Sequence, residues 1–203
     1  MIHPGTELRY IDADIGFGVF ATAFIPRGTL VYVQDELDIS ITEDEFDAMD
    51  EHMQRNVEHY SFIDQHGHRV LCWDHAKYVN HCCHPNIIST GYGFEIAITD
   101  IAEGEQVTDD YGLFNVSYDT EFGCGIEDCR RRIFRDDPLR YHSAWDKQVV
   151  AALRCFGDVP QALLPYLDAD IRDQLYAYLA GEAEYLSVLN TLYRGDARVR
   201  ATG

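Results

Sequence analysis

The stretch that decides the fold is Asn80-His81-Cys82-Cys83-His84-Pro85-Asn86. It combines thiols, side chains that can pair with backbone groups, and a proline that ends the local strand. A second segment, Gly104-Glu105-Gln106-Val107-Thr108-Asp109-Asp110-Tyr111-Gly112, follows after a short predicted strand. Its sequence is typical of a tight turn that leads into a strand ending on a tyrosine. In this order and at this separation, the two segments are too specific to be coincidental.

Two further segments come before this pair. Residues 15–22 contain Gly16-Phe17-Gly18 and are followed by Ile25-Pro26-Arg27-Gly28-Thr29. A lone Gly-x-Gly usually marks a turn. Placed upstream of the other motifs, it becomes a candidate for backbone that approaches a cofactor closely. Residues 59–64 and 70–74 are predicted strands of the same assembly.

Together these motifs resemble those of SET-domain protein-lysine methyltransferases, in the form of a small bacterial-type SET protein. The resemblance covers about residues 7–133. It implies an α+β fold, β-rich, with several small twisted sheets and a pseudoknot, although knotted threading is otherwise rare. It also implies methyl transfer from S-adenosylmethionine to the side-chain amine of lysine in a protein or basic peptide.

The resemblance assigns roles to individual residues. The implied cofactor-binding residues are Gly16, Phe17, Gly18, Tyr60, Asn80, His81 and Phe122. The implied catalytic residues are Tyr111, Tyr60 and His81, with the Tyr111 hydroxyl at the methyl-transfer channel. Taken alone, a tyrosine after a strand or a single histidine is usually a core residue, but the motif context favours function for both.

Asp109 departs from the family pattern, because this position, two before the tyrosine, is usually aromatic and influences how many methyl groups fit. Its carboxylate could hydrogen-bond the acceptor amine, hold a water, or turn to solvent, so mono-, di- or trimethylation stays open. Carboxylates favour the charged form of a nearby lysine, which opposes methylation. We therefore expect the acids to lie around the substrate groove rather than along the channel.

The cysteines form a second departure. Cys124-Gly125-Ile126-Glu127-Asp128-Cys129-Arg130 resembles the end of the family's post-SET zinc motif, whose first cysteine is Phe122 here. Cys83, Cys124 and Cys129 thus give an incomplete ligand set, since structural zinc prefers four ligands. Either Cys82, His84 or Cys72 completes a zinc site, or the metal has been lost and Phe122 packs apolarly.

Composition limits the kinds of partner. The 203 residues carry a formal net charge of −19, which disfavours direct nucleic-acid binding and favours basic peptides. Adaptation of a whole proteome would explain the same charge, because Lys77 and Lys147 are the only lysines. No apolar run is long enough for a membrane span and no export signal is evident, so we expect a cytoplasmic protein without a membrane partner. The six cysteines are unevenly spaced, which favours reduced thiols or a metal over disulfides.

Hydrophobic periodicity divides the chain. A capping box at Thr42 and a helical stripe predict an insert helix over residues 43–58, with Met49 and Met53 in the core. The SET domain is assigned to residues 1–136, with a post-SET-like segment over about 118–133, and residues 137–203 to a C-terminal helical extension. Three apolar stripes predict helices in that extension: Trp145, Val149, Ala152, Leu153 and Phe156; Ile171, Leu175, Tyr178 and Leu179; Tyr185, Leu189, Leu192 and Tyr193.

Two other functions remain open. The first is a catalytically inactive SET-like module that binds basic protein segments. The second is methylation of a different amine or a guanidine, with Asp109 as the cation's partner. The substrate protein, the target lysine and the oligomeric state do not follow from the sequence.

Overall fold

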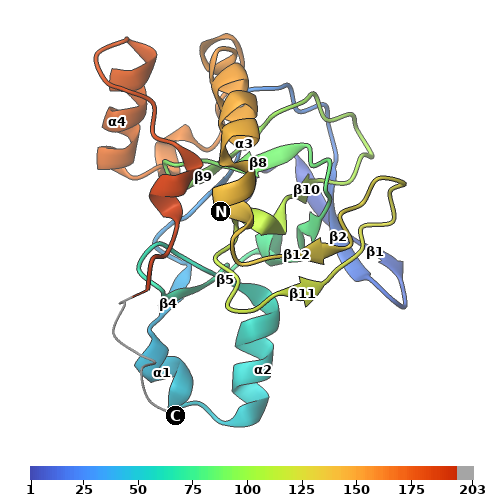
Figure 1. The fold of residues 1–203 in the computed structure, drawn as a ribbon. Helices are drawn as coiled ribbons and strands as arrows, with labels where there is room; N and C mark the ends of the chain where they lie inside the picture. Colours follow the sequence, from blue (N-terminus) through green and yellow to red (C-terminus); the bar gives the residue numbers. More distant parts are fainter. Residues whose placement is uncertain (196–203) are drawn as a thin grey trace.

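The computed structural model describes residues 1–195 and shows a β-rich α+β fold of several small sheets (Figure 1). The antiparallel sheets are β1 (Thr6–Asp12) with β2 (Gly16–Ala21); β3 (Leu30–Val33), β9 (Phe94–Ala97) and β8 (Ile87–Ser89); β4 (Ile39–Ile41), β6 (Arg69–Leu71) and β5 (Ser61–Ile63); and β11 (Thr120–Glu121) with β12 (Arg132–Ile133). The strands β7 (Asn80–His81) and β10 (Thr108–Asp109) pair in parallel. This architecture confirms the predicted fold class.

The longer helices lie at two opposite ends of the molecule (Figure 1). They are α1 (Glu43–Asp47) and α2 (Glu51–Tyr60) at one end, and α3 (Asp137–Leu153) and α4 (Ala169–Leu179) at the other. Single turns of 3-10 helix lie at His75–Tyr78, Tyr111–Leu113, Phe156–Asp158, Leu164–Tyr166 and Val188–Thr191. No helix within residues 1–195 is both long and apolar enough to span a membrane.

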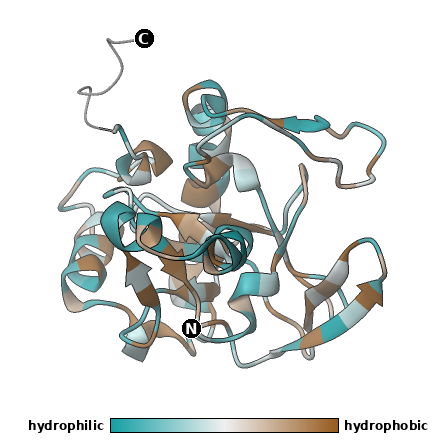
Figure 2. Cartoon of the chain, turned by 90° about the horizontal axis from the view of Figure 1, so that it is seen from below, coloured by the Kyte–Doolittle hydropathy of each residue, from teal (hydrophilic) through white to brown (hydrophobic). Residues whose placement is uncertain are grey.

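The sheet β3–β9–β8 forms the centre of the core. All of Leu30–Val33 is buried, as expected for a strand covered on both faces. Leu30 packs in a cluster with residues of α3, whereas Val31 packs in a second cluster with β2. Figure 2 shows hydrophobic residues gathered on the central strands, while the outer helices carry mixed faces.

Asn86, at the end of the first motif, fixes the second motif in space. Its Oδ1 accepts the backbone N–H of Thr108 at 2.9 Å, and its Nδ2 donates to the carbonyl of Gln106 at 2.8 Å. These bonds hold the chain that enters β10 beside β7, so Tyr111 follows at a defined position.

The insert is two helices rather than the single helix predicted over residues 43–58. The predicted capping box is present, with Glu45 N–H donating to Thr42. However, α1 ends at Asp47, and Asp50 then caps a new helix by accepting the N–H of Met53. The interruption moves Met53 to the surface, where it is 48% exposed, so its predicted core position is wrong.

The stripe on α3 is confirmed, because Trp145, Val149 and Leu153 are buried. The second stripe is confirmed as α4, with Leu175 fully buried. The third predicted helix is wrong, since residues around Tyr185 are not helical and only Val188–Thr191 form a 3-10 turn. Asp146 of α3 instead accepts hydrogen bonds from this segment, which holds it extended (Tyr185 Oη 3.0 Å, Ser187 Oγ 2.7 Å, Val188 N–H 2.9 Å).

The division of the chain at residue 136 stays a prediction. Buried residues from both sides of that boundary, such as Phe94 of β9 and Val149 of α3, pack in one cluster. Residues 196–203 of the predicted extension lie outside the described residues.

Candidate active site

The short strand β7 joins the two ends of the predicted site. Asn80 Nδ2 donates to the carbonyl of Phe17 at 3.0 Å, within the Gly-x-Gly bend. The next residue, His81, accepts the backbone N–H of Tyr111 on Nδ1 at 3.2 Å. Because successive side chains of a strand point to opposite faces, two adjacent residues can reach two different partners. The structure thus brings the bend at residues 16–18, β7 and Tyr111 together.

Gly18 allows two polar side chains to approach the backbone closely. A Cβ at this position would lie 2.7 Å from Gln106 Nε2 and 2.9 Å from Asn80 Nδ2. Gly16 serves a different need, because its φ of +80° lies in the left-handed region that favours glycine. Phe17 between them is 46% exposed, and its ring centroid lies 5.9 Å from that of Tyr78.

The phenol of Tyr111 is held by the main chain. Its hydroxyl donates to the carbonyl of Val79 at 2.6 Å. Its ring centroid lies 5.5 Å from that of His81 and 5.6 Å from that of Phe122. Burial raises the pKa of Tyr111 above its usual value, and the nearby carboxyls Asp109 and Glu95 add to this effect. The phenol is therefore protonated at neutral pH.

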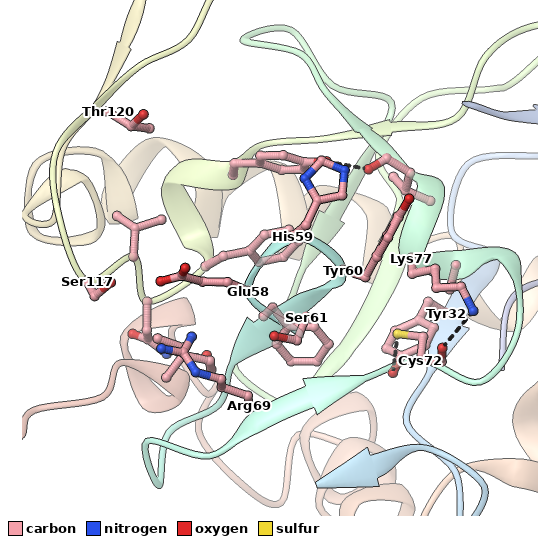
Figure 3. A pocket seen from close by; sticks show the side chains of 18 of the residues that line it. Tyr32, Glu58, His59, Tyr60, Ser61, Arg69, Cys72, Lys77, Ser117 and Thr120 are labelled. Atoms are coloured by element: carbon pink, nitrogen blue, oxygen red, sulfur yellow. Dashed lines mark hydrogen bonds between the residues drawn. The ribbon is translucent and has the colours of Figure 1, made fainter. Parts of the chain in front are cut away.

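An elongated cavity of about 230 Å³ lies beside Tyr111 (Figure 3). In Figure 3, Tyr32, Cys72 and Lys77 gather at one end of the cavity and Ser117 and Thr120 at the other. The rings that line it belong to Tyr32, His59, Tyr60, Phe62, Tyr111, Phe114 and Tyr118. A second cavity of about 320 Å³ shares Ile63, Arg69, Asn115, Val116 and Ser117 with the first.

The structure therefore places the predicted site residues in two groups. Tyr60 and Tyr111 line the cavity together. Gly16, Phe17, Gly18, Asn80, His81 and Phe122 are not among the lining residues described for it. Phe122 still contacts this region, because its ring lies 5.3 Å from that of His81 and 5.6 Å from that of Tyr111. Their roles toward a cofactor stay predictions.

The carboxyl group of Glu95 lines the cavity and that of Asp109 lies nearby, against our expectation that acids would lie around the groove rather than along the channel. Glu95 lines the cavity, and Asp109 nearby is fully buried, which rules out a side chain turned to solvent. Ser89 Oγ donates to Asp109 Oδ2 at 3.1 Å and lies 3.5 Å from Glu95 Oε1. Burial raises the pKa of Glu95 to about 7. Burial and the Glu95 charge raise the pKa of Asp109 well above its usual value.

Cys83, Cys124 and Cys129, predicted as metal ligands, do come together. The Sγ atoms of Cys83 and Cys129 lie 3.9 Å apart, and Cys83 N–H donates to Cys124 Sγ at 3.4 Å. Cys129 Sγ accepts the N–H groups of Cys124 and Arg131, both at 3.3 Å, and these bonds lower the pKa of Cys129 to about 7. Backbone N–H groups aimed at sulfur stabilise a thiolate, which is the form that binds a metal.

The fourth position is less suited to a metal. His81 lies close to Cys83 and Cys124, with the three possible ligand atoms within 4.8 Å of one another. However, Nδ1 of His81 accepts the Tyr111 N–H, so a neutral ring carries its proton on Nε2, 3.3 Å from Cys83 Sγ. Burial and the Arg130 charge lower the pKa of His81 to about 4, which keeps the ring neutral. With this tautomer, His81 donates a hydrogen bond to the Cys83 sulfur.

Two of the substitutes considered from the sequence lie apart from the three thiols. Cys72 is buried beside Tyr32, and its Sγ lies 3.4 Å from the Tyr32 hydroxyl. His84 is exposed and pairs with Asp128 at 3.1 Å. The third substitute, Cys82, lies beside the thiols: its Sγ accepts the N–H of His84 at 3.4 Å, and its thiol interacts with that of Cys124. Zinc therefore stays a prediction.

Two features of the site were missed by sequence reasoning. The first is Glu95. It lies between the apolar residues Phe94 and Ile96, and this alternation predicts a side chain that faces solvent rather than a functional site. The other is the ion pair between Arg130 and Asp110, which ties the segment after Cys129 to the residue before Tyr111. The sequence Asp109-Asp110-Tyr111 marked the acid, but nothing nearby in sequence indicated its partner.

Residues 16–112 match the family model described as SET domain. Among solved structures, the chain is similar to a Plasmodium falciparum protein crystallised as a candidate histone methyltransferase, with 17% identity, 54% of this chain and 95% of that chain covered, and a TM-score of 0.41. It is also similar to KRYPTONITE in complex with mCHH DNA, an H3(1-15) peptide and SAH, with 19% identity, 64% of this chain and 29% of that chain covered, and a TM-score of 0.45. No curated protein matches the sequence. The match covers 97 of the 203 residues and spans every motif of the site from the Gly-x-Gly bend to Tyr111, so this part of the chain is similar to SET domains.

Proposed function

We propose that the protein transfers a methyl group from S-adenosylmethionine to the side-chain amine of lysine in a protein or basic peptide. SET proteins use this methyl donor for protein methylation. The observation that carries the proposal is β7, which holds the Gly-x-Gly bend by Asn80 and the backbone of Tyr111 by His81.

The residues of the chain would act mainly by positioning. When bound, S-adenosylmethionine supplies an electrophilic methyl group, so the protein must orient an unprotonated amine in line with it. Deprotonating a lysine of ordinary pKa at neutral pH costs about 4 kcal/mol. The cavity beside Tyr111 is walled by rings that suit an aliphatic stem, and it excludes much of the water around the amine.

The charge of the chain supports a basic substrate. A net charge of −19 attracts lysine-rich segments and repels nucleic acid. We propose a cytoplasmic site of action, which the free thiols of all six cysteines support, because thiols are kept reduced in that compartment.

The test is incubation of the purified protein with labelled donor and a panel of basic peptides. Labelled lysine is the expected product, and Tyr111→Phe should lower the rate at least about a hundredfold while the protein stays folded. Tyr176→Phe on the exposed face of α4 is the matched control and should leave the rate unchanged. Unlabelled peptides across the panel, or equal labelling by Tyr111→Phe, would refute the proposal.

A second candidate is a SET-like module that binds basic segments without catalysis. The buried carboxyl at Asp109 and the three-thiol set favour it, since both depart from the family pattern. Calorimetry with S-adenosylmethionine separates the two. A catalytic protein must bind the donor, whereas a purely binding module has no such requirement.

A further inference from the structure

The carboxyl group of Glu95 lines the cavity and shares the Ser89 hydroxyl with the buried carboxyl group of Asp109. Glu95 is cross-strand neighbour to both Tyr32 of β3 and Ser89 of β8, so the three residues form one row across the central sheet. The hydroxyl of Ser89 spans the carboxyls of Glu95 and Asp109. Within residues 1–195, no lysine, arginine or histidine forms an ion pair with either acid.

Several titratable groups lie near Glu95. They are Tyr32 from β3, Asp109 from β10, Cys72 from the segment after β6, and Tyr111 from the turn after β10. Two cationic side chains, Lys77 and Arg69, line the same cavity. Lys77 Nζ donates to the carbonyl of Cys72 at 3.4 Å. The N-terminal ammonium of Met1 slightly opposes the rise in the pKa of Glu95, but its ion-pair partner is Asp35, at 2.9 Å.

Lys77 and Arg69 line the same cavity, but within residues 1–195 neither of them forms an ion pair with Glu95 or Asp109. Two adjacent carboxyls in a medium of low dielectric constant cannot both ionise, so the pair holds a proton or needs a cation. A buried charge without a partner is costly, and a cation that enters the cavity would remove that cost. Glu95 lies on the cavity wall, whereas Asp109 is fully buried, so Glu95 is the carboxyl that a ligand can reach.

The rest of the wall matches a cation on an apolar stem. The rings of Tyr32 and Phe62 lie 6.5 Å apart, and those of Phe62 and Phe114 lie 5.7 Å apart and stacked. The row of rings continues to Tyr111, whose ring centroid lies 5.2 Å from that of Phe114. Such a wall provides contact for methylene groups and cation–π attraction for an ammonium.

We propose that Glu95 is a binding and catalytic residue, whose carboxylate receives the alkylammonium group of the acceptor and takes one proton from it. This inference rests on the proposed methyl transfer and deepens it. In the step, one N–H bond of the ammonium breaks and one O–H bond forms on Glu95. The carboxylate first stabilises the ammonium as an ion pair. Proton transfer then converts the two buried charges into a neutral amine and a carboxylic acid, which a site of low dielectric constant favours, and the lone pair left on nitrogen is the nucleophile. The proton passes to water when the product leaves.

The first test measures binding without any methyl donor. N-acetyl-lysine methylamide and its uncharged analogue N-acetyl-norleucine methylamide are titrated into the protein and followed by NMR. Glu95→Gln should weaken binding of the lysine probe at least about tenfold, equivalent to about 1.4 kcal/mol. The affinity for the norleucine probe should change less than about twofold. Glu103→Gln, on the exposed turn between β9 and β10, is the matched control. Equal affinity of the lysine probe for Glu95→Gln and the unchanged protein overturns the proposal.

The second test needs no variant and therefore no assumption about folding. The carboxyl ¹³C signal of Glu95 is titrated in the unchanged protein, with and without the lysine probe. Titration near pH 7, moved to lower pH by the probe, is the expected result. A Glu95 signal that titrates like an ordinary glutamate, or that ignores the probe, overturns the proposal.

The two proposals fail in different ways. If the unchanged protein methylates peptides and Glu95→Gln does so equally fast from pH 6 to pH 9, the role of Glu95 is wrong and the enzyme stands. If no peptide is methylated but the lysine probe binds through Glu95, the cation site stands and the proposed reaction is wrong.

Discussion

The unusual carboxyl Glu95 predicts a stability that depends on pH. Its pKa is about 7 in the folded protein, against an ordinary value of 4.5. Between these pH values the folded state holds a proton that the unfolded chain has released. Stability therefore falls as pH rises through this range, because the folded state binds more protons. Glu95→Gln keeps the shape of the side chain and removes this titration.

The size of the effect follows from the two pKa values. The gap from 4.5 to about 7 corresponds to about 3 kcal/mol, at about 1.36 kcal/mol per pH unit. The loss of folding stability caused by ionising Glu95 is absent below pH 4.5, grows between pH 4.5 and about 7, and is complete above pH 7. The contribution of distant acids cancels in the difference, because they are present in both proteins. Asp109 does not cancel: the Glu95 charge raises its pKa, so Glu95→Gln also lowers the pKa of Asp109 and enlarges the difference at high pH.

Urea unfolding followed by circular dichroism measures the effect at pH 4.5, 6, 7 and 8. Glu95→Gln should match the unchanged protein at the lowest pH and exceed its free energy of unfolding at pH 8 by about 3 kcal/mol or more. Glu103→Gln, exposed on a turn, should show no such trend. A difference between Glu95→Gln and the unchanged protein that stays constant with pH would refute the reasoning, because the carboxyl would then titrate normally.

Two further substitutions test the packing around the site. Arg130→Met leaves the buried carboxyl of Asp110 without its cation and should lower the free energy of unfolding by about 3–5 kcal/mol, whereas Arg135→Met, exposed, should change it by less than about 0.5 kcal/mol. Gly91→Ala would place a Cβ 2.2 Å from a carbonyl oxygen of the C-terminal segment and should cost about 1–3 kcal/mol. Gly123→Ala, with nothing within 4 Å, is its control. Urea unfolding measures all four, and equal losses within either pair would contradict the packing described.

Much of the fold could be predicted from the sequence because its signals are local. The stripe that includes Trp145 and Val149 predicted α3, since a helical period requires only neighbouring residues. The motif at Asn80 and the tyrosine at Tyr111 predicted two parts of one site, which the hydrogen bonds through His81 join. The insert helix was less predictable, because Asp50 favours a new helix start over the continuing apolar stripe.

The sequence by itself determined the resemblance to SET domains, the strands that carry the motifs and the identity of Tyr111, because these depend on residues close together in the chain. Only the tertiary structure decided the surroundings of Glu95 and the contact between His81 and Cys83. The alternation of a strand tells which side a residue faces, but what covers that side comes from distant segments. Burial and neighbouring charge then set which protons are held, and neither can be read from the order of residues.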